Sequence, residues 1–332
     1  MVEIQQQMQV VSVLSPGKNS RLTIEQQPTP VAKPGQLLLK VKAAGVNRAD
    51  LMQRLGHYPP PPGESDILGL EVAGEVVQVG NDADEHWLGR EVFGIVAGGG
   101  YAEYALLQTK HAISKPAHWT WQHAGAAAET LLTAYQLLFT LGKLKSGQRV
   151  VLHAGASGVG TSAIQLAKLV NAQVAVTVGR PEKADACLAL GADIAINYQQ
   201  RQFSTALAEQ WPLGADLILD PVAGGYVNEN IKILADDGVI IIYALMGGRI
   251  IEQFDMAALF KKRGSMLCST LRNRTNQYKA ELTANYVATF GQAMAAGKLT
   301  PLVSESFSWK NAEQAHNVMT NNNNIGKLVL MF

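Results

Sequence analysis

The segment from Val150 to Leu169, VVLHAGASGVGTSAIQLAKL, has the residue types and spacing of a phosphate-binding turn. An apolar, β-branched run enters a turn of glycines and small residues, and a helix-like run leaves it. At such a junction the amides of the first helical turn and the positive end of the helix dipole can hold a pyrophosphate. Glycine is needed there because a Cβ would keep the phosphate away from the backbone.

The spacing matches the dinucleotide-binding pattern GxGxxG imperfectly, since Gly155, Ser157 and Gly160 occupy its three glycine positions. Such a pattern is weak evidence alone, and many glycine-rich turns are only structural. Here it follows a strand and opens a helix, which is the context that dinucleotide binding requires. A purely structural turn remains the alternative. The predicted cofactor contacts in this turn are Gly155, Ser157, Gly158, Val159 and Gly160.

The residues after the next strand indicate which dinucleotide binds. In NAD sites an acidic residue about 20 positions further on holds the ribose 2′-hydroxyl. That strand ends at Val178 without an acid, and Arg180 and Lys183 stand where a 2′-phosphate would lie. Tyr198, at the end of the third strand, could stack on the same phosphate or donate to it. We predict NADPH, although Glu182 is a contrary sign and the two basic residues could be ordinary surface charges.

The chain from Gly147 onward alternates strand-like and helix-like runs. Each strand-and-helix unit takes about 25 residues, which is typical of βαβ crossovers and predicts a parallel sheet. An Ala- and Leu-rich run before them, Ala124–Leu141, predicts one long helical stretch. The predicted strands are Val150–Ala154, Val174–Val178, Ile194–Tyr198, Leu217–Asp220 and Val239–Ala244, and the predicted helices are Thr161–Val170 and Lys183–Leu190.

The first hundred or so residues are rich in predicted strands. Short runs of Val and Leu, bounded by Gly, Pro and Asp, predict strands at Gln36–Val41, Glu71–Val79 and Glu91–Ile95. The segment Tyr58–Gly63, YPPPPG, predicts a stiff exposed loop because proline lacks the amide donor that a helix or a central strand needs.

Composition limits the class of protein. The 332 residues suggest about two domains, and 28 basic against 27 acidic residues argue against a nucleic-acid binder. The two cysteines, Cys187 and Cys268, cannot form a disulfide framework or a four-cysteine zinc site. The first ten residues show no signal-peptide pattern, and the longest apolar stretch is far shorter than the ~20 residues needed to span a bilayer. We expect a cytoplasmic protein without membrane partners.

The chain also resembles a known family, the zinc-lacking, zeta-crystallin-like quinone oxidoreductases of the medium-chain dehydrogenase/reductase superfamily. The resemblance is greatest to the p53-inducible quinone oxidoreductase branch. It extends over nearly the whole chain in the family's order. The matching stretches are Ala43–Gly63, Ile67–Val76, Gly98–Tyr104, Leu131–Leu138, His153–Lys168, Leu245–Gly248, Phe260–Ser265 and Asn324–Leu330.

This resemblance implies an α/β fold with two domains. Residues 1–125 and 270–332 would form a GroES-like, partly open β-barrel domain, and residues 126–269 a Rossmann domain with a doubly wound parallel sheet. It implies an active site in the cleft between them, reduction of quinones or similar small electrophiles by NADPH, and a homodimer.

The resemblance also implies that no metal is bound. Zinc-dependent relatives have a catalytic Cys where this chain has Asn47, and a Gly-His-Glu motif where it has Gly69, Leu70 and Glu71. The four structural cysteines of those relatives have no counterpart, and the histidines show no ligand spacing. We therefore predict a metal-independent enzyme.

By the same resemblance, Asn47 and Tyr58 would face the nicotinamide and position the substrate. For Asn47 the alternative is a turn-stabilising residue before a helix, and for Tyr58 it is a loop anchor. For Thr133 the alternative is an ordinary helix residue, and for Arg272 and Arg274 it is an ordinary surface arginine. The further cofactor contacts are Thr133, Leu245, Met246, Gly247, Arg272 and Arg274.

A quinone ring accepts hydride readily, and its anion can take a proton from water, so we expect no essential general acid. A reductase of alkenals or enones is the alternative enzyme, and it would need a positioned acid, for which Tyr58 is the candidate. A non-catalytic NADPH-binding regulatory protein is the alternative from another class.

Overall fold

The computed structural model describes residues 4–332, apart from the side chains of residues 82 and 83. The chain divides into two compact units. Unit 1 comprises Met1–Leu132 and Leu271–Phe332, and unit 2 comprises Thr133–Thr270. The boundaries predicted from the sequence are 125/126 and 269/270. Within the described part of the chain, no helix is both long and apolar enough to cross a membrane.

Unit 2 contains a six-stranded sheet in which all strands are parallel. The spatial order is β10-β9-β8-β11-β12-β13, so the order of connection reverses between β8 and β11. This is the doubly wound arrangement, and ligands bind such sheets at the carboxyl ends of the strands near the reversal. The strands are β8 (Arg149–His153), β9 (Gln173–Val178), β10 (Ile194–Asn197), β11 (Ala215–Asp220), β12 (Leu234–Ile242) and β13 (Ser265–Cys268).

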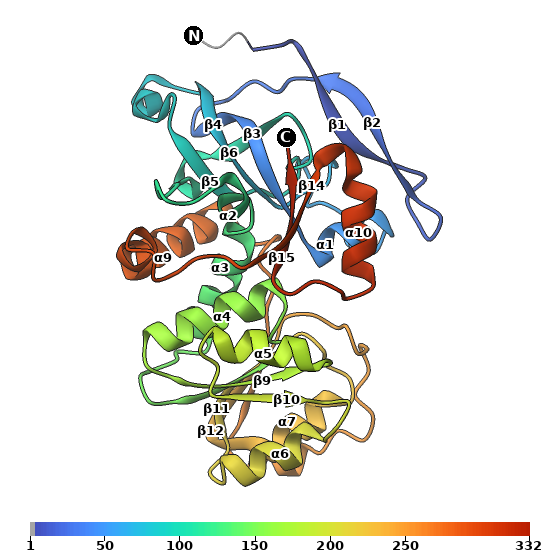
Figure 1. The fold of residues 1–332 in the computed structure, drawn as a ribbon, viewed down its shortest axis with the longest axis vertical. Coiled ribbons are helices and arrows are strands. Elements are labelled where there is room, and N and C mark those ends of the chain that lie inside the picture. Colours follow the sequence, from blue (N-terminus) through green and yellow to red (C-terminus); the bar gives the residue numbers. More distant parts are fainter. Residues whose placement is uncertain (1–3) are drawn as a thin grey trace. The chain divides into compact units, whose positions relative to one another are not determined.

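Helices cover both faces of this sheet (Figure 1). Helices α4 and α5 contact β8, β9 and β10 on one face, and α6 and α7 pack together on the other. The strands are accordingly near-continuous apolar runs, because a sheet covered on both faces has no solvated side. The helices are α4 (Gly158–Leu169), α5 (Pro181–Ala189), α6 (Phe203–Gln210), α7 (Tyr226–Ile233) and α8 (Met256–Lys261).

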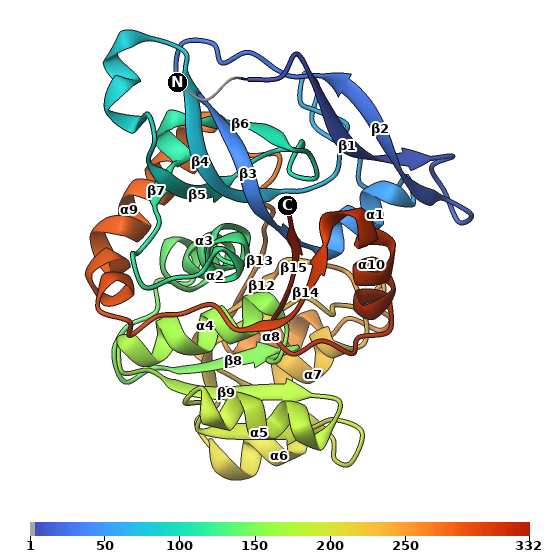
Figure 2. The same ribbon diagram turned by 45° about the horizontal axis from the view of Figure 1, so that its top comes forward.

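Unit 1 contains a seven-stranded sheet and a separate hairpin of β1 and β2. The sheet has the order β14-β15-β3-β4-β5-β7, and β6 pairs with β3. The last strand of the chain lies antiparallel to β3, with Leu328 opposite Val46, and the C-terminus follows it (Figure 2). The strands are β1 (Gln7–Leu14), β2 (Arg21–Pro28), β3 (Gln36–Val46), β4 (Glu71–Val79), β5 (Glu91–Ile95), β6 (Tyr104–Gln108), β7 (Ile113–Ser114), β14 (Val303–Ser308) and β15 (Lys327–Met331).

The α-helices that begin in unit 1 are α1 (Arg48–Arg54), α2 (Trp121–Gly125), α3 (Ala128–Tyr135), α9 (Asn276–Ala295) and α10 (Ala312–Thr320). Short 3₁₀ turns lie at Asp82–Trp87, Thr109–His111 and Trp309–Asn311. The long helical stretch predicted over Ala124–Leu141 is helical apart from a break at residues 126–127. The chain forms α2, then α3, then a π-helical segment at Gln136–Leu141. The first break follows Gly125, which lies so close to β3 that a Cβ would be 2.6 Å from the Cβ of Ala43.

Candidate functional site

The glycine-rich turn of unit 2 joins β8 to α4. Ser157 caps the helix, and its hydroxyl oxygen accepts a hydrogen bond from the amide of Gly160 at 3.1 Å. The first amides of a helix have no partner inside the helix, so those of Gly158 and Val159 can serve an anion. The turn lies at the carboxyl end of β8, next to the point where the strand order reverses.

Two glycines of this turn are required by close packing. A Cβ on Gly155 would lie 2.5 Å from the Cβ of Val176 on β9. A Cβ on Gly160 would lie 2.6 Å from the carbonyl oxygen of Ala154 and would overlap that of Gly155. Larger residues would therefore separate the helix from the strand and displace the amides that face the anion.

The neighbouring strands bring the residues predicted for the 2′-phosphate close to one another. The amide of Tyr198 donates to the carbonyl of Val178 at 3.0 Å, and a Cβ on Gly179 would lie 2.6 Å from the Tyr198 hydroxyl. Arg180 caps α5, and Lys183 follows in its first turn. The Arg180 Nε lies 3.3 Å from Glu182 Oε1, in a pair whose side chains are 42% and 58% exposed. An exposed pair of this kind is weak, so a phosphate can compete for the guanidinium.

The loop after β12, which contains Leu245, Met246 and Gly247, is tied to the loop after β11. The amide of Met246 donates to Pro221 at 3.0 Å, and that of Gly247 donates to Val222 at 2.7 Å. The apolar side chains of Leu245 and Met246 are both exposed. The loops therefore present an apolar surface at the carboxyl ends of these strands.

Asp220 holds the loop after β11, and the sequence did not suggest this role. Its carboxylate is fully buried and accepts from the amides of Val222 and Ala223 at 2.6 and 2.9 Å. It also accepts from the side-chain amide of Asn230 at 2.8 Å. The sequence feature that could have indicated this role is an acidic residue at the end of an apolar strand.

In unit 1, Asn47 belongs to a buried ionic network. The ammonium of Lys327 lies 2.7 Å from Glu71 Oε1, and the two side chains are 4% and 1% exposed. The side-chain oxygen of Asn47 accepts from Lys327 at 2.7 Å, and its amide nitrogen donates to Glu71 at 3.0 Å. Its backbone amide donates to Asp50 at 2.7 Å and so begins α1. Asn47 thus has a structural role at this corner, and its contact with a substrate stays a prediction.

Tyr58 is fixed by Arg272. The guanidinium of Arg272 donates to the Tyr58 carbonyl at 3.1 Å, to the Ala97 carbonyl at 2.8 Å and to Gln53 Oε1 at 2.7 Å. It also lies 5.3 Å from the centre of the Tyr58 ring, as in a cation–π contact. Arg272 is 5% exposed, so contact with a cofactor phosphate would require these bonds to break. The segment Tyr58–Gly63 forms no helix or strand, as predicted.

Thr133 and Arg274 are two other predicted cofactor contacts. Thr133 lies on α3 and is partly exposed. Arg274 lies over the ring of Tyr278, 4.8 Å from its centre. Their roles towards a cofactor stay predictions.

Two further acids in unit 1, which the sequence motifs do not single out, have altered pKa values. Burial raises the pKa of Asp50 to about 6, against its hydrogen bonds from Asn47 and Gly69. Burial and the nearby charge of Glu71 raise the pKa of Glu129 to about 7. The signal for Glu129 was a single acid inside an Ala- and Leu-rich run, AAAETLLTA.

No metal-binding group was found in the described part of the chain, where no three or more His, Cys, Asp or Glu side chains gather to hold an ion. At the corner where zinc relatives would bind the metal, Glu71 is paired with the Lys327 ammonium. Asn47 is engaged by the same two side chains, and Leu70 offers no donor atom. This donor set does not fit zinc.

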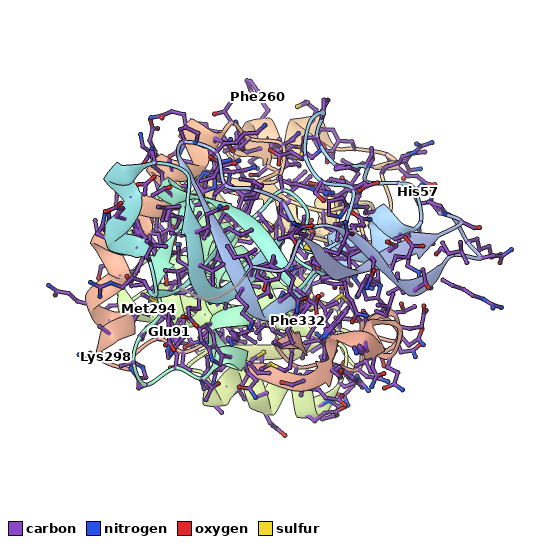
Figure 3. All side chains as sticks on the ribbon, turned by 90° about the horizontal axis from the view of Figure 1, so that it is seen from above. His57, Glu91, Phe260, Met294, Lys298 and Phe332 are labelled. Atoms are coloured by element: carbon purple, nitrogen blue, oxygen red, sulfur yellow. The ribbon has the colours of Figure 1, made fainter. Side chains whose placement is uncertain are left out.

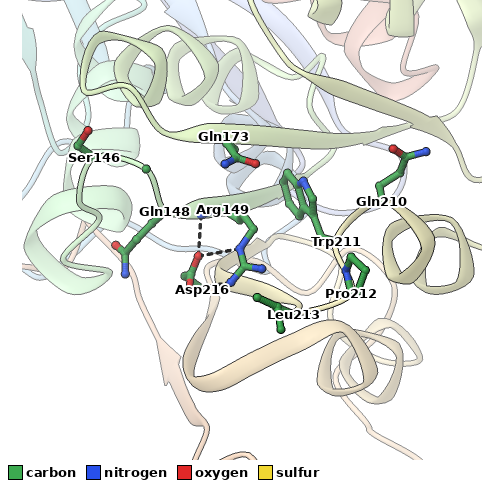
Figure 4. Close-up of a pocket in the computed structure, with 10 residues that line it drawn as sticks. Ser146, Gln148, Arg149, Gln173, Gln210, Trp211, Pro212, Leu213 and Asp216 are labelled. Atoms are coloured by element: carbon green, nitrogen blue, oxygen red, sulfur yellow. Dashed lines mark hydrogen bonds and ion pairs between the residues drawn. The ribbon is translucent and has the colours of Figure 1, made fainter.

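A pocket of about 590 Å³ opens in unit 2 on a different edge (Figure 4). It lies near the amino ends of β8, β9 and β11, where Arg149 pairs with Asp216 at 3.2 Å and Trp211 forms one wall. Parallel sheets bind nucleotides at their carboxyl ends, so this pocket is not part of the candidate site.

Comparison with known proteins identifies the family. Residues 33–117 match the alcohol dehydrogenase GroES-like domain, and residues 158–286 match the zinc-binding dehydrogenase family. A mycobacterial protein solved in complex with NADPH has the same fold, with a TM-score of 0.86 and 27% identity over 98% of this chain and 100% of its own. The chain is a medium-chain dehydrogenase/reductase. The Rossmann and GroES-like domains expected from the sequence are therefore confirmed.

Relatives of this dehydrogenase/reductase have differing names. Quinone oxidoreductase of Pongo abelii is 28% identical over 305 residues, which are 91% of each chain. Prostaglandin reductase-3 of Mus musculus is 31% identical over 244 residues, which are 72% of this chain and 63% of that protein. Polyketide synthase GfsB of Streptomyces halstedii is 32% identical over 322 residues, and this chain spans only 6% of its length.

Proposed function

We propose that the protein is an oxidoreductase that uses NADPH to reduce quinones by hydride transfer, without a metal ion. The observation that carries this proposal is the arrangement at the carboxyl ends of β8, β9 and β10. A capped, glycine-lined turn suited to a pyrophosphate lies beside Arg180, Lys183 and Tyr198, which are suited to a 2′-phosphate.

The residues of unit 2 would bind and orient the cofactor. The amides near Ser157 and Gly160 hold the pyrophosphate, and the basic residues at the start of α5 neutralise the 2′-phosphate. The exposed Leu245 and Met246 exclude water from the reacting ring. NADPH, when bound, supplies the hydride.

The residues of unit 1 would position the acceptor. Arg272 holds the Tyr58 ring and loop, so the ring can cover a planar substrate. Asn47 is held by Lys327 and Glu71, and its side-chain amide also donates to the Gly45 carbonyl at 3.3 Å, so it would have to give up one of these bonds to orient a carbonyl oxygen. Positioning of this kind favours hydride transfer to a quinone, since its ring accepts hydride readily. The named quinone oxidoreductase among the relatives supports this acceptor class, and we retain the p53-inducible branch as part of the proposal.

The second candidate is reduction of the carbon–carbon double bond of an alkenal or enone. Two observations favour it, the relative named prostaglandin reductase-3 and the partly exposed Glu129, whose pKa is raised to about 7 by burial and by Glu71. This reaction leaves an enolate, which needs a proton from a positioned acid.

The test is to compare NADPH oxidation with 1,2-naphthoquinone, 1,4-benzoquinone and a 2-alkenal as acceptors. We expect turnover with both quinones. Turnover of the alkenal alone would overturn the quinone proposal in favour of the second candidate. Binding of NADPH without turnover of any acceptor would favour a non-catalytic NADPH-binding protein.

We also propose that the protein is a homodimer joined along β13. This strand is the edge of the sheet in unit 2, and all four of its residues are exposed. Phe260, just before it, is 82% exposed, and its side chain points outward in Figure 3. Two copies of an edge strand can pair about a two-fold axis and bury such apolar side chains. Sedimentation should give twice the chain mass, and Leu267→Lys should give monomers; a monomeric wild-type protein would contradict the proposal.

A further inference from the structure

The carboxylate of Glu129 differs from the two carboxylates near it, because no described residue forms a hydrogen bond or ion pair with it. Asp50 is fully buried and accepts from the amides of Asn47 and Gly69. Glu71 is buried and accepts from Lys327. Among the described side chains of residues 4–332, nothing forms a hydrogen bond or ion pair with the carboxylate of Glu129, and the residue as a whole is partly exposed. Glu129 is therefore free to give a proton to a bound molecule, whereas the other two would first lose their bonds.

The charges around Glu129 favour its protonated form near neutral pH. Burial is the largest cause of its raised pKa of about 7, and the charge of Glu71 is the next. Asp50 adds to this effect, while the ammonium groups of Lys327 and Lys279 oppose it. The groups that act on Glu129 thus come from β4, α1, β15 and α9. A general acid is most effective when its pKa lies near the working pH.

Glu129 also lies among the residues predicted to position the substrate. Its backbone amide donates to Glu71 Oε2 at 3.0 Å, and the other oxygen of Glu71 holds Asn47 at 3.0 Å. Its charge acts on Tyr58, whose pKa is raised by burial and then by Glu129, and it also acts on Arg272.

The position of Glu129 on its helix points the same way. It lies in the first turn of α3, four residues before Thr133, the predicted nicotinamide contact. Residues four apart share one face of a helix. The face of α3 that would meet the nicotinamide therefore also carries this acid.

We propose that Glu129 is the proton donor of the reduction, giving its proton to the anion that hydride transfer leaves on the substrate. The proposal rests on the proposed function and adds an acid that the sequence did not predict. The hydride forms a new bond to substrate carbon, and an electron pair moves onto the conjugated oxygen. The Glu129 O–H bond then breaks, and its proton goes to that oxygen in a quinone or to the α-carbon in an enone. NADPH becomes NADP⁺, the substrate gains two electrons, and solvent returns a proton to the carboxylate.

The main test is the pH profile of kcat for the wild-type protein and for Glu129→Gln, with NADPH and whichever acceptor the wild type reduces. Above its pKa of about 7, Glu129 has no proton to give, so the wild-type kcat should fall about tenfold per pH unit. Glu129→Gln should be slower by about 10²-fold or more at pH 6 and should lose this pH dependence. A 2-alkenal should show a larger loss than a quinone, whose anion can also take a proton from water.

Controls separate catalysis from folding. Glu305→Gln makes the same chemical change at an exposed position on β14 and should keep the wild-type profile. NADPH affinity should be unchanged in Glu129→Gln. If that variant fails to fold, Glu129→Asp keeps the acid and should keep the pH dependence at a lower rate. A wild-type rate and profile in Glu129→Gln would overturn the proposal while leaving the proposed function intact.

A second measurement does not depend on activity. In protein labelled with ¹³C at the glutamate carboxyls, NMR should show one resonance that titrates near pH 7 and is missing in Glu129→Gln. Its absence from the wild type would overturn the proposal. If no acceptor is reduced by the wild-type protein, the proposed function fails, and this titration then reports separately on Glu129.

Discussion

Lys327 is the centre of the polar network in unit 1. Its ammonium donates to Glu71, to the side-chain oxygen of Asn47 and to the carbonyl of Val46, all at 2.7–2.8 Å. A buried ion pair of this kind adds little net stability over an apolar pair, but removal of one partner leaves the other charge uncompensated. The network therefore fixes the position of Asn47, but loss of either charged partner would strongly lower the free energy of unfolding.

Lys327→Met should lower the free energy of unfolding by about 3–5 kcal/mol because the buried carboxylate of Glu71 then has no positive partner. The double variant Lys327→Met/Glu71→Gln should lose much less free energy of unfolding than the sum of the losses in Lys327→Met and Glu71→Gln. Urea unfolding of the wild type and these three variants measures the coupling between the two residues. Small and additive effects would show that the pair is not the centre of the network.

The raised pKa of Glu129 predicts a pH-dependent stability. Its ordinary value is 4.5, so folding raises it to about 7 and favours the protonated form. The stability from this group is fully present below about pH 4.5 and is lost as pH rises through 7. The free energy of unfolding of the wild type should therefore fall, relative to Glu129→Gln, between pH 5 and pH 8. An equal difference at both values would mean that Glu129 titrates normally.

At the scale of elements, the β8–α4 turn depends on glycine for space. Gly160→Ala would drive a Cβ against the backbone carbonyls of residues 154 and 155, which cannot move aside as a flexible side chain can. We expect a loss of about 1–3 kcal/mol in stability and weaker binding of NADPH. Gly225→Ala is the matched control, because nothing lies within 4 Å of its Cβ and its φ is −63°. Thermal unfolding and NADPH titration of both variants measure these effects. Equal stability and equal NADPH affinity in the two variants would show that the turn does not need glycine at position 160.

The sequence predicted helices and strands well where neighbouring residues mark their ends. Strands β4 and β5 have the predicted bounds, because runs of Val between turn-forming residues mark both ends. Helix α4 begins at Gly158, earlier than predicted, because Ser157 caps it. The break after Gly125 was missed, and so was the close approach of Gly125 to Ala43 on β3, because a contact between distant segments leaves no local pattern. The same reason applies to the site: Glu71 meets Lys327, 256 residues away in sequence, and no local pattern reports such a partner.

At the scale of the whole molecule, we propose that unit 2 binds the nucleotide and that residues of unit 1 position the substrate. In this proposal the carboxyl ends of β8, β9 and β10 bind NADPH for the reduction of a quinone. Arg180 and Lys183, at the start of α5, would distinguish NADPH from NADH.

The most direct measurement is therefore the NADPH-to-NADH preference of quinone reduction, in the wild type and in Arg180→Ala/Lys183→Ala. The wild type should prefer NADPH. Loss of two charged contacts should raise the KM for NADPH by at least about tenfold and leave the reaction with NADH little changed. A preference for NADPH that is the same in both proteins would contradict the proposed 2′-phosphate site, and a wild type that prefers NADH would contradict the proposal that the protein uses NADPH.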